Sequence, residues 1–262
     1  MKAAFLTGIR QLEIREAPDP KITRPGDVLL RIETVGVCGS DVHYYRTGRI
    51  GPLVVKYPEI TGHECAGTVV ERGNAASKLR IGQRVTVDPL VTCGKCDQCR
   101  GGRPHTCRRQ AFLGCPGQAP GALAEYLVMP AECCYPVPDS MTQVQAALIE
   151  PLAIGLYAQR MASAKAGAKI AILGSGPIGL CVLLTSRAAG ACTTYVTDLI
   201  DERLEVARRC GANWTGNPRH AAIVAAIKEL EPLGMDLIFE CAGQQETLDQ
   251  AVELLKPLLY WQ

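Results

Sequence analysis

Four cysteines, Cys93, Cys96, Cys99 and Cys107, lie within fifteen residues at the spacing C-x2-C-x2-C-x7-C. Short loops between thiolates can fold around one Zn²⁺ as a tetrahedron, and four sulfur ligands leave no open position for a substrate. The spacing therefore predicts a closed, structural zinc lobe over residues 89–110. Two disulfides, or free thiols in a reducing compartment, are the alternatives that the spacing leaves open.

A second set of metal-ligand types is spread more widely along the chain. Cys38 is followed 25 residues later by His63 and Glu64, in a chain that has only four histidines. A catalytic zinc needs about three protein ligands and one open position for water or substrate. Cys38, His63 and Glu64 supply the three ligands, and Glu150 is expected to approach them from a domain junction. The sequence thus predicts a catalytic zinc in addition to the structural one.

Residues 174–179 read Gly-Ser-Gly-Pro-Ile-Gly, directly after the short apolar segment 170–173 and before the apolar helical stretch 180–189. The pattern G-x-G-x-x-G between a strand and a helix is the fingerprint of a dinucleotide-binding loop. Gly174 permits the tight turn, Gly176 lets the backbone approach a pyrophosphate, and Gly179 lets helix and strand pack closely. Pro177 and Ile178 complete this loop, which leads into the helix, and the N–H groups at the helix N-terminus favour an anion.

Asp198 ends the next apolar strand, 194–197, and lies 19 residues beyond Gly179. A carboxylate at this place accepts hydrogen bonds from the adenosine ribose and repels a 2′-phosphate, so NAD is predicted over NADP. The nearby Arg203 weakens that preference, because a guanidinium would accommodate the phosphate. An ordinary turn residue at the end of a strand is the alternative for Asp198.

Composition narrows the class of protein. The odd number of cysteines, 13, cannot pair completely within one chain, and the first residues lack the apolar stretch of a secretory signal, so we expect reduced thiols and a cytoplasmic location. No apolar run reaches the roughly 18 residues that a membrane-spanning helix needs. With 28 basic and 26 acidic residues, the formal charge of +2 shows no bias toward nucleic acid. Membrane and nucleic-acid roles are therefore predicted to be absent.

The elements that must position these residues change in character near residue 150. Residues 1–150 carry short β-branched runs such as 28–32 and 68–71, divided by glycine and proline, and are predicted to form a mainly β domain. Residues 151–262 alternate apolar strands with helical stretches, which is typical of a parallel, doubly wound sheet. The expected strands there are 170–173, 194–197, 212–215 and 235–240, with helices near 202–210 and 245–255.

In order along the chain, these motifs resemble the zinc-containing medium-chain alcohol and polyol dehydrogenases, and most closely the branch that acts on sorbitol, xylitol and L-iditol. The segments that carry the resemblance are 36–45 (Gly-Val-Cys-Gly-Ser-Asp-Val-His-Tyr-Tyr), 62–64 (Gly-His-Glu), the four-cysteine lobe, 150–153 (Glu-Pro-Leu-Ala) and the loop 174–179. Glu150 stands where typical alcohol dehydrogenases have a third, cysteine ligand, which favours the polyol branch.

The resemblance implies a GroES-like β-barrel fold for the first domain and a Rossmann fold for the second. It implies that Cys38 and His63 hold the catalytic zinc, with Glu64 as an exchangeable ligand. It further implies that the substrate is a polyol, that its secondary alcohol gives hydride to NAD and that a ketose results, with two zinc ions per chain. Ser40 and His43 would relay the proton, Tyr44 would face the substrate, and Phe112 would form a wall of the pocket.

After Lys256 and Pro257, where a doubly wound domain turns into its fifth strand, only residues 258–262 remain. Compared with the family, the Rossmann domain is therefore expected to be incomplete, with weak or no dehydrogenase activity in this chain. The relatives are homo-oligomers, and their interface uses residues from the later part of the Rossmann domain. Two alternatives stay open: a dehydrogenase acting on other small alcohols, and a zinc-binding protein without enzymatic activity.

Overall fold

The computed structural model describes residues 1–191 and 193–257. The chain divides into two compact units, Met1–Glu150 (unit 1) and Pro151–Gln262 (unit 2). Within the described residues, none of the helices has the length and apolar character that crossing a bilayer would need.

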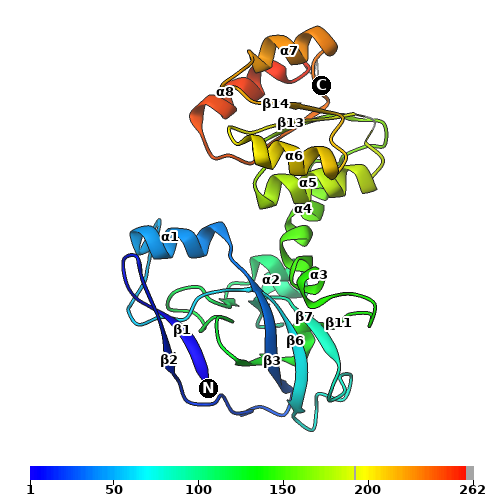
Figure 1. Cartoon of the computed structure of the whole chain (residues 1–262). Helices are drawn as coiled ribbons and strands as arrows, with labels where there is room; N and C mark the ends of the chain where they lie inside the picture. The colour runs from blue at the N-terminus through cyan, green and yellow to red at the C-terminus, as the bar shows by residue number, and fades with distance from the viewer. Residues whose placement is uncertain (192, 258–262) are drawn as a thin grey trace. The chain divides into compact units, whose positions relative to one another are not determined.

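Unit 1 is built on an antiparallel five-stranded sheet (Figure 1). Its strand order is β10 (Tyr126–Pro130), β3 (Asp27–Gly36), β6 (Glu64–Arg72), β7 (Arg84–Val87) and β11 (Cys134–Pro136). Val28, Leu30, Val69 and Val85 are completely buried beneath it, because alternate side chains of each strand point to the same face. The register places Gly36 of β3 opposite Glu64 of β6, so the ends of these two strands meet near the predicted metal ligands.

Short elements surround this sheet. They are the hairpins β1 (Lys2–Gly8) with β2 (Gln11–Glu16) and β4 (Arg49–Ile50) with β5 (Leu53–Val54), helix α1 (Gly39–Thr47), and the 3-10 turn η2 (Ala131–Cys133). Helix α3 (Gln143–Ala147) packs on the sheet through Ala146 and Ala147, which contact Ala66 and Val137 in one buried cluster. Thr142 caps this helix by accepting a hydrogen bond from the Gln145 N–H, a favourable N-terminal arrangement.

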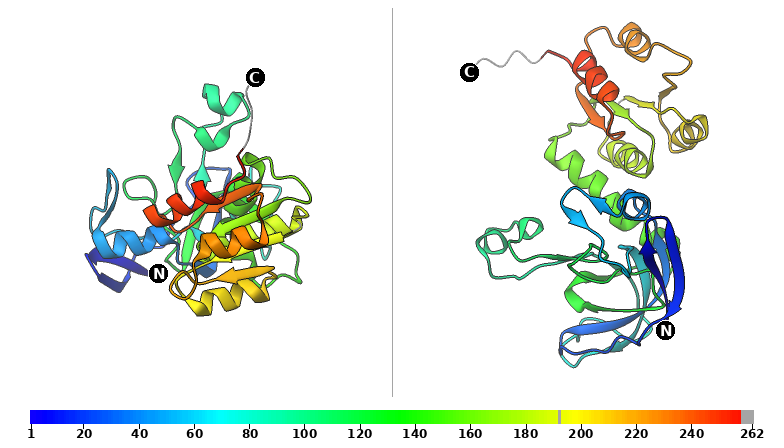
Figure 2. Two further views of the ribbon diagram at one scale, coloured as in Figure 1. Left: turned by 90° about the horizontal axis from the view of Figure 1, so that it is seen from above. Right: turned by 90° about the vertical axis from the view of Figure 1, so that its left-hand side faces the viewer.

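The cysteine lobe is part of unit 1 and projects from its sheet on two short paired strands. Strand β8 (Leu90–Val91) pairs with β9 (Ala111–Phe112), and between them lie helix α2 (Asp97–Arg100) and the 3-10 turn η1 (Pro104–Thr106). The right-hand view of Figure 2 shows this lobe standing out from the sheet. No residue of α2 or η1 is buried, so the lobe lacks an apolar core of its own and needs another source of stability.

Unit 2 is a parallel sheet in the order β14 (Trp214–Gly216), β13 (Thr193–Thr197), β12 (Lys169–Leu173) and β15 (Leu237–Glu240). The helices are α4 (Ile149–Met161), which begins at the end of unit 1, then α5 (Pro177–Ala188), α6 (Asp201–Arg209), α7 (Ile223–Leu230) and α8 (Gln245–Leu254). Strand β12 is buried on both sides: Ile170 and Ile172 face the α5 side, while Ala171 and Leu173 face α7 and α8. An almost continuous apolar strand of this kind is what a parallel sheet covered on both faces requires.

The predicted strands and helices of unit 2 are present with small shifts. Strand β14 begins at Trp214 instead of residue 212, and β15 begins at Leu237 instead of residue 235. The reason for the second shift is that Met235 forms an isolated bridge with Leu255, and Asp236 donates its N–H to the carbonyl of Lys169. Residues 258–262, where the fifth strand of a doubly wound sheet was expected, lie outside the described residues.

Candidate metal centres and dinucleotide-binding loop

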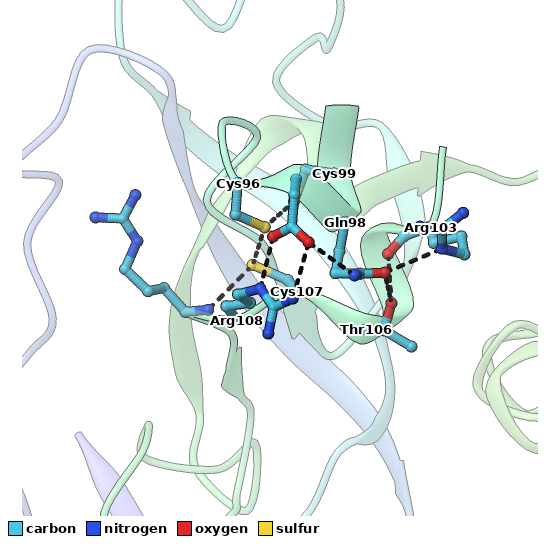
Figure 3. Close-up of polar contacts among 9 residues, drawn as sticks. Cys96, Gln98, Cys99, Arg103, Thr106, Cys107 and Arg108 are labelled. Carbon is cyan, nitrogen blue, oxygen red and sulfur yellow. Dashed lines mark hydrogen bonds and ion pairs between the residues drawn. The ribbon is translucent and has the colours of Figure 1, made fainter. Parts of the chain in front are cut away.

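The four cysteines of the lobe converge on one point. The sulfur atoms of Cys93, Cys96, Cys99 and Cys107 all lie within 4.8 Å of one another. The Cys96 Sγ is 3.5 Å from the Cys99 Sγ and 3.9 Å from the Cys107 Sγ (Figure 3). These separations are too long for a disulfide, whose sulfurs are about 2.05 Å apart, and the four cysteines are free. The disulfide alternative is therefore wrong for this cluster.

Zinc fits this cluster well. With a Zn–S bond of about 2.3 Å, the sulfurs of a tetrahedral site are roughly 3.8 Å apart, close to the two separations above. Backbone donors also favour the thiolate form: the N–H of Lys95 is the main cause that lowers the pKa of Cys93 to about 6. Cys107 Sγ accepts hydrogen bonds from the N–H groups of Cys93 at 3.3 Å and Arg109 at 3.4 Å. Each of these contacts stabilises negative charge on sulfur.

Polar contacts around the sulfurs fix the loops that carry them (Figure 3). Asp97 accepts two hydrogen bonds from the Arg108 guanidinium, at 2.6 and 2.8 Å. Gln98 Oε1 accepts one from Arg103 Nε and one from Thr106 Oγ1, both at 3.0 Å. These contacts join the segment that carries Cys96 and Cys99 to the segment that carries Cys107.

The second ligand set lies where α1 and β6 begin. The Cys38 sulfur, a His63 nitrogen and a Glu64 carboxylate oxygen are all within 4.8 Å of one another. Cys38 is the N-cap of α1, His63 comes directly before β6, and Glu64 is its first residue. Cys, His and carboxylate groups at this separation can hold one zinc with a position left open, as a catalytic site requires. Among the described residues, this set and the cysteine lobe are the two such clusters.

Asp41 ties the two ligand-bearing segments together. Its Oδ2 accepts a hydrogen bond from the Cys38 N–H at 3.0 Å, and its Oδ1 accepts one from the Gly62 N–H at 3.0 Å. The side chain is buried, with 6% of the residue exposed. Asp41 therefore fixes the backbone beside Cys38 and the backbone beside His63 at the same time. No role for Asp41 follows from the sequence alone, although its place three residues after an N-cap is the usual capping position.

Gly36 leaves room for the Glu64 carboxylate. A Cβ built on Gly36 would lie 2.3 Å from Glu64 Oε2, so any side chain at residue 36 would displace this carboxylate. Because the atom in conflict is the end of a flexible side chain, we expect Gly36→Ala to fold normally. It should lose zinc at the Cys38 set, with an affinity reduced roughly tenfold to a hundredfold, as for changes that misplace a ligand. Competition with a chromophoric chelator measures this affinity.

The control for this substitution is Gly26→Ala, also in unit 1, where a built Cβ meets nothing within 4 Å. It should leave zinc affinity unchanged. Equal zinc affinity in both variants would contradict a ligand role for Glu64.

Glu150 does not join the three ligands in the 4.8 Å set. It lies in the first turn of α4, close enough for His63 and Glu64 to influence its titration, and burial raises the pKa of Glu150 to about 7. Its role as a further ligand stays a prediction.

The other predicted site residues lie around this set. Burial raises the pKa of the Cys38 thiol. The hydroxyl and the N–H of Ser40 hydrogen-bond this thiol and oppose that rise. The His43 side chain is exposed on α1. The Phe112 ring packs edge-on against the imidazole of His63, with centroids 5.2 Å apart.

Tyr44 is 5% exposed and packs against Leu6 and Val55. Burial, followed by the neighbouring Cys115, raises the pKa of Tyr44 to about 12, so its phenol keeps its proton at neutral pH. The contacts place Tyr44 within unit 1 near the ligand set, and its role toward substrate stays a prediction.

The glycine-rich loop of unit 2 has the geometry that the sequence predicts. Gly174 has a φ of +107°, and a Cβ there would lie 2.9 Å from the backbone of Cys241 and Ala242. A Cβ on Gly179 would lie 1.9 Å from the carbonyl oxygen of Gly174, so the start of α5 can approach the loop only without a side chain. Gly176 is the N-cap of α5 and Pro177 its first residue. Beside Gly176 the backbone is open, which suits a bound pyrophosphate.

Asp198 follows β13 and lies next to this loop. Its Oδ2 accepts a hydrogen bond from the Ser175 N–H at 2.8 Å, and its Oδ1 accepts one from the Ile200 N–H at 2.9 Å. Arg203 Nη1 is 3.6 Å from Asp198 Oδ2 and lies 4.0 Å from a Cβ built on Gly176. The carboxylate that would bind a ribose and the guanidinium that would meet a phosphate are therefore side by side at the loop.

Known protein families match segments of both unit 1 and unit 2. The family model described as alcohol dehydrogenase GroES-like domain matches residues 24–139, and the model described as zinc-binding dehydrogenase matches residues 177–258. A sorbitol dehydrogenase from Bacillus subtilis is 40% identical over 96% of this chain and 71% of its own length. An L-idonate 5-dehydrogenase from Vitis vinifera is 38% identical over 95% of this chain and 69% of its own length.

Solved structures give the same result. An oxidoreductase from Escherichia coli of unknown specificity superposes with a TM-score of 0.91 at 36% identity, covering 97% of this chain and 74% of that one. A zinc-binding dehydrogenase from Sinorhizobium meliloti bound to NADP has a TM-score of 0.87 at 35% identity, covering 97% and 73%.

Proposed function

The chain belongs to the zinc-binding dehydrogenases with an alcohol dehydrogenase GroES-like domain, and from this premise we propose that it oxidises a secondary alcohol of a polyol to a ketone with NAD. The observation that carries the proposal is the convergence of Cys38, His63 and Glu64 on one point, in a chain 40% identical to a sorbitol dehydrogenase.

Each group in the proposed site has a distinct task. Bound zinc supplies a Lewis acid for the substrate hydroxyl, and NAD supplies the hydride acceptor. Cys38, His63 and Glu64 hold the metal, and Asp41 keeps their backbone segments in place through Cys38 and Gly62. Ser40 Oγ, which hydrogen-bonds the Cys38 thiol, would accept the proton of the substrate hydroxyl while its own hydroxyl proton passes to the imidazole of His43. His43, exposed on α1, would then give a proton to water.

The cofactor is proposed to lie on the loop 174–179. The N–H groups at the start of α5 would donate hydrogen bonds to the pyrophosphate, and the Asp198 carboxylate would accept hydrogen bonds from the ribose hydroxyls. Arg203, whose Nη1 is 3.6 Å from Asp198 Oδ2, would be within reach of a phosphate group of the same cofactor.

The test is NAD reduction, followed by absorbance, with sorbitol, xylitol and ethanol and a matched NADP series. Polyol turnover above ethanol turnover supports the proposal, while a preference for ethanol favours an alcohol dehydrogenase. No NAD binding and no turnover, with zinc present, would leave a zinc-binding protein without this activity.

Asp198 is expected to set the choice of cofactor. In Asp198→Ala we expect kcat/KM with NAD to fall roughly tenfold to a hundredfold, since a hydrogen bond to a charged group contributes about 1.5–3 kcal/mol. Activity with NADP should rise relative to NAD, because the carboxylate no longer repels the 2′-phosphate and Arg203 is released. Asp249→Ala, on the exposed side of α8, is the control. An unchanged ratio of NADP to NAD activity would refute the role of Asp198.

The proposed site also suits a reducing compartment, in which thiols persist. The cysteines of the described residues are free, and both metal clusters need sulfur that is not oxidised. We therefore propose a cytoplasmic location.

A further inference from the structure

The loop formed by residues 112–121 is pressed against the segment that carries His63. A Cβ built on Gly114, whose φ is +70°, would lie 2.7 Å from the Gly62 carbonyl oxygen, and one on Gly121 would lie 2.1 Å from the Thr61 carbonyl oxygen. The N–H of Ala122 donates to the Gly62 carbonyl at 2.8 Å. Both ends of the loop are thus fixed to the backbone next to the metal ligands.

Side chains of this loop form hydrogen bonds that connect Phe112 with Tyr44, an aromatic residue of α1 that is far from it in sequence. Gln118 Oε1 accepts from the Phe112 N–H at 2.9 Å, and Gln118 Nε2 donates to Cys115 Sγ at 3.1 Å. Cys115 in turn shares a hydrogen bond with the Tyr44 hydroxyl of α1. Cys115 is 8% exposed and Tyr44 5%, so these bonds are shielded from water, which strengthens them.

This chain of hydrogen bonds ends close to the proposed metal ligands, both at Phe112 and at Tyr44. Phe112 contacts the His63 imidazole with its ring, and Tyr44 belongs to the helix that begins after Cys38 and carries Asp41. We propose that Cys115 and Gln118, here called the brace, are positioning residues that hold Tyr44 and Phe112 at the walls of the polyol site. This inference rests on the proposed function, because it concerns how the same site recognises the hydroxyl-bearing chain of its substrate.

The brace should matter for long, hydroxylated substrates and not for short ones. A polyol extends beyond the reacting carbon and needs oriented walls, whereas ethanol occupies only the reacting position. Because the Tyr44 hydroxyl is held by Cys115, the position of the Tyr44 ring is fixed before substrate binds, which lowers the entropy cost of recognition. Loss of the brace should therefore raise KM for polyols and leave kcat, zinc content and KM for ethanol unchanged.

The experiment compares Cys115→Ala, Cys115→Ser and Gln118→Ala. In the two alanine variants, KM for sorbitol should rise about threefold to tenfold, the range expected for one lost hydrogen bond. Serine retains a donor and an acceptor, so Cys115→Ser should restore KM. Because Cys115 and Gln118 act in series, the double alanine variant should show less than the product of the two single effects.

Cys133→Ala is the matched control, since Cys133 is buried in unit 1 at 5% exposure and its thiol donates a hydrogen bond to the Leu90 carbonyl at 3.8 Å. It should lower thermal stability as Cys115→Ala does, without changing KM. A second readout does not depend on activity: in protein with ¹³Cζ-labelled tyrosine, the Tyr44 resonance, identified with Tyr44→Phe, should shift in Cys115→Ala and not in Cys133→Ala.

Equal KM values in Cys115→Ala and Cys133→Ala would overturn the role in substrate binding. If the unmodified protein turns over no polyol, the proposed function fails, and with it that role. The tyrosine resonance then decides separately whether the brace orients Tyr44, and an unchanged resonance would overturn the brace itself.

Discussion

Replacing His63 by alanine is expected to lower kcat/KM for sorbitol about 1,000-fold. A Lewis acid contributes several kcal/mol to such a reaction, and about 4 kcal/mol corresponds to this factor at 1.36 kcal/mol for each tenfold. His63 is one of the three proposed zinc ligands, whose ligand atoms lie within 4.8 Å of one another, so we expect its loss to remove the metal from the proposed catalytic site. Elemental analysis should find that one of the two zinc ions is lost while the lobe keeps its own.

The control is His220→Ala. His220 is exposed and lies 3.6 Å from Asp201 in unit 2, far along the chain from either cluster, and its removal should leave turnover and zinc content unchanged. Full zinc occupancy together with full activity in His63→Ala would show that the metal centre is elsewhere.

Replacing Cys107 by serine should have the largest effect on stability. We expect the free energy of unfolding to fall by about 3 kcal/mol or more, because structural zinc in small domains contributes on the order of 10–16 kcal/mol of binding free energy. A neutral hydroxyl is a poor ligand for zinc, and no residue of α2 or η1 is buried to compensate. At roughly 2–4 °C for each kcal/mol, the melting temperature should fall by about 6–12 °C.

Cys210→Ser, in unit 2 and outside both metal clusters, serves as the comparison and should leave the melting temperature nearly unchanged. Differential scanning calorimetry with and without a chelator tests the explanation, since a chelator should reproduce the loss in the parent protein but add little in Cys107→Ser. If chelation leaves the parent protein unaffected, zinc does not stabilise the lobe.

Local patterns predicted much of this protein. The cysteine spacing indicated one cluster because its four ligands are close in sequence, and the glycines at 174, 176 and 179 indicated a strand, a turn and a helix that also lie in succession. Both predictions depend on short loops, in which spacing nearly determines geometry. The resemblance to polyol dehydrogenases is confirmed by the family and by relatives at 33–40% identity.

Contacts between distant segments could not be predicted in the same way. The role of Gly36 depends on the register that sets it opposite Glu64, and the role of Asp41 depends on Gly62, 21 residues away. Cys115 and Gln118 had no local signal, because a thiol and an amide in a turn-rich segment are common. The start of β15 was missed because Met235 pairs with Leu255, a contact that no window around residue 235 contains.

Asp41 has one further consequence, for the order in which the protein and its metal come together. Two backbone N–H groups already meet its carboxylate in the polypeptide itself, so the Cys38 and His63 segments are joined without an ion. We therefore expect the zinc proposed at Cys38, His63 and Glu64 to be removable while the surrounding sheet persists. In the cysteine lobe no helix residue is buried, so zinc should contribute a larger share of the lobe's stability, and we expect the two metals to exchange with solution at very different rates.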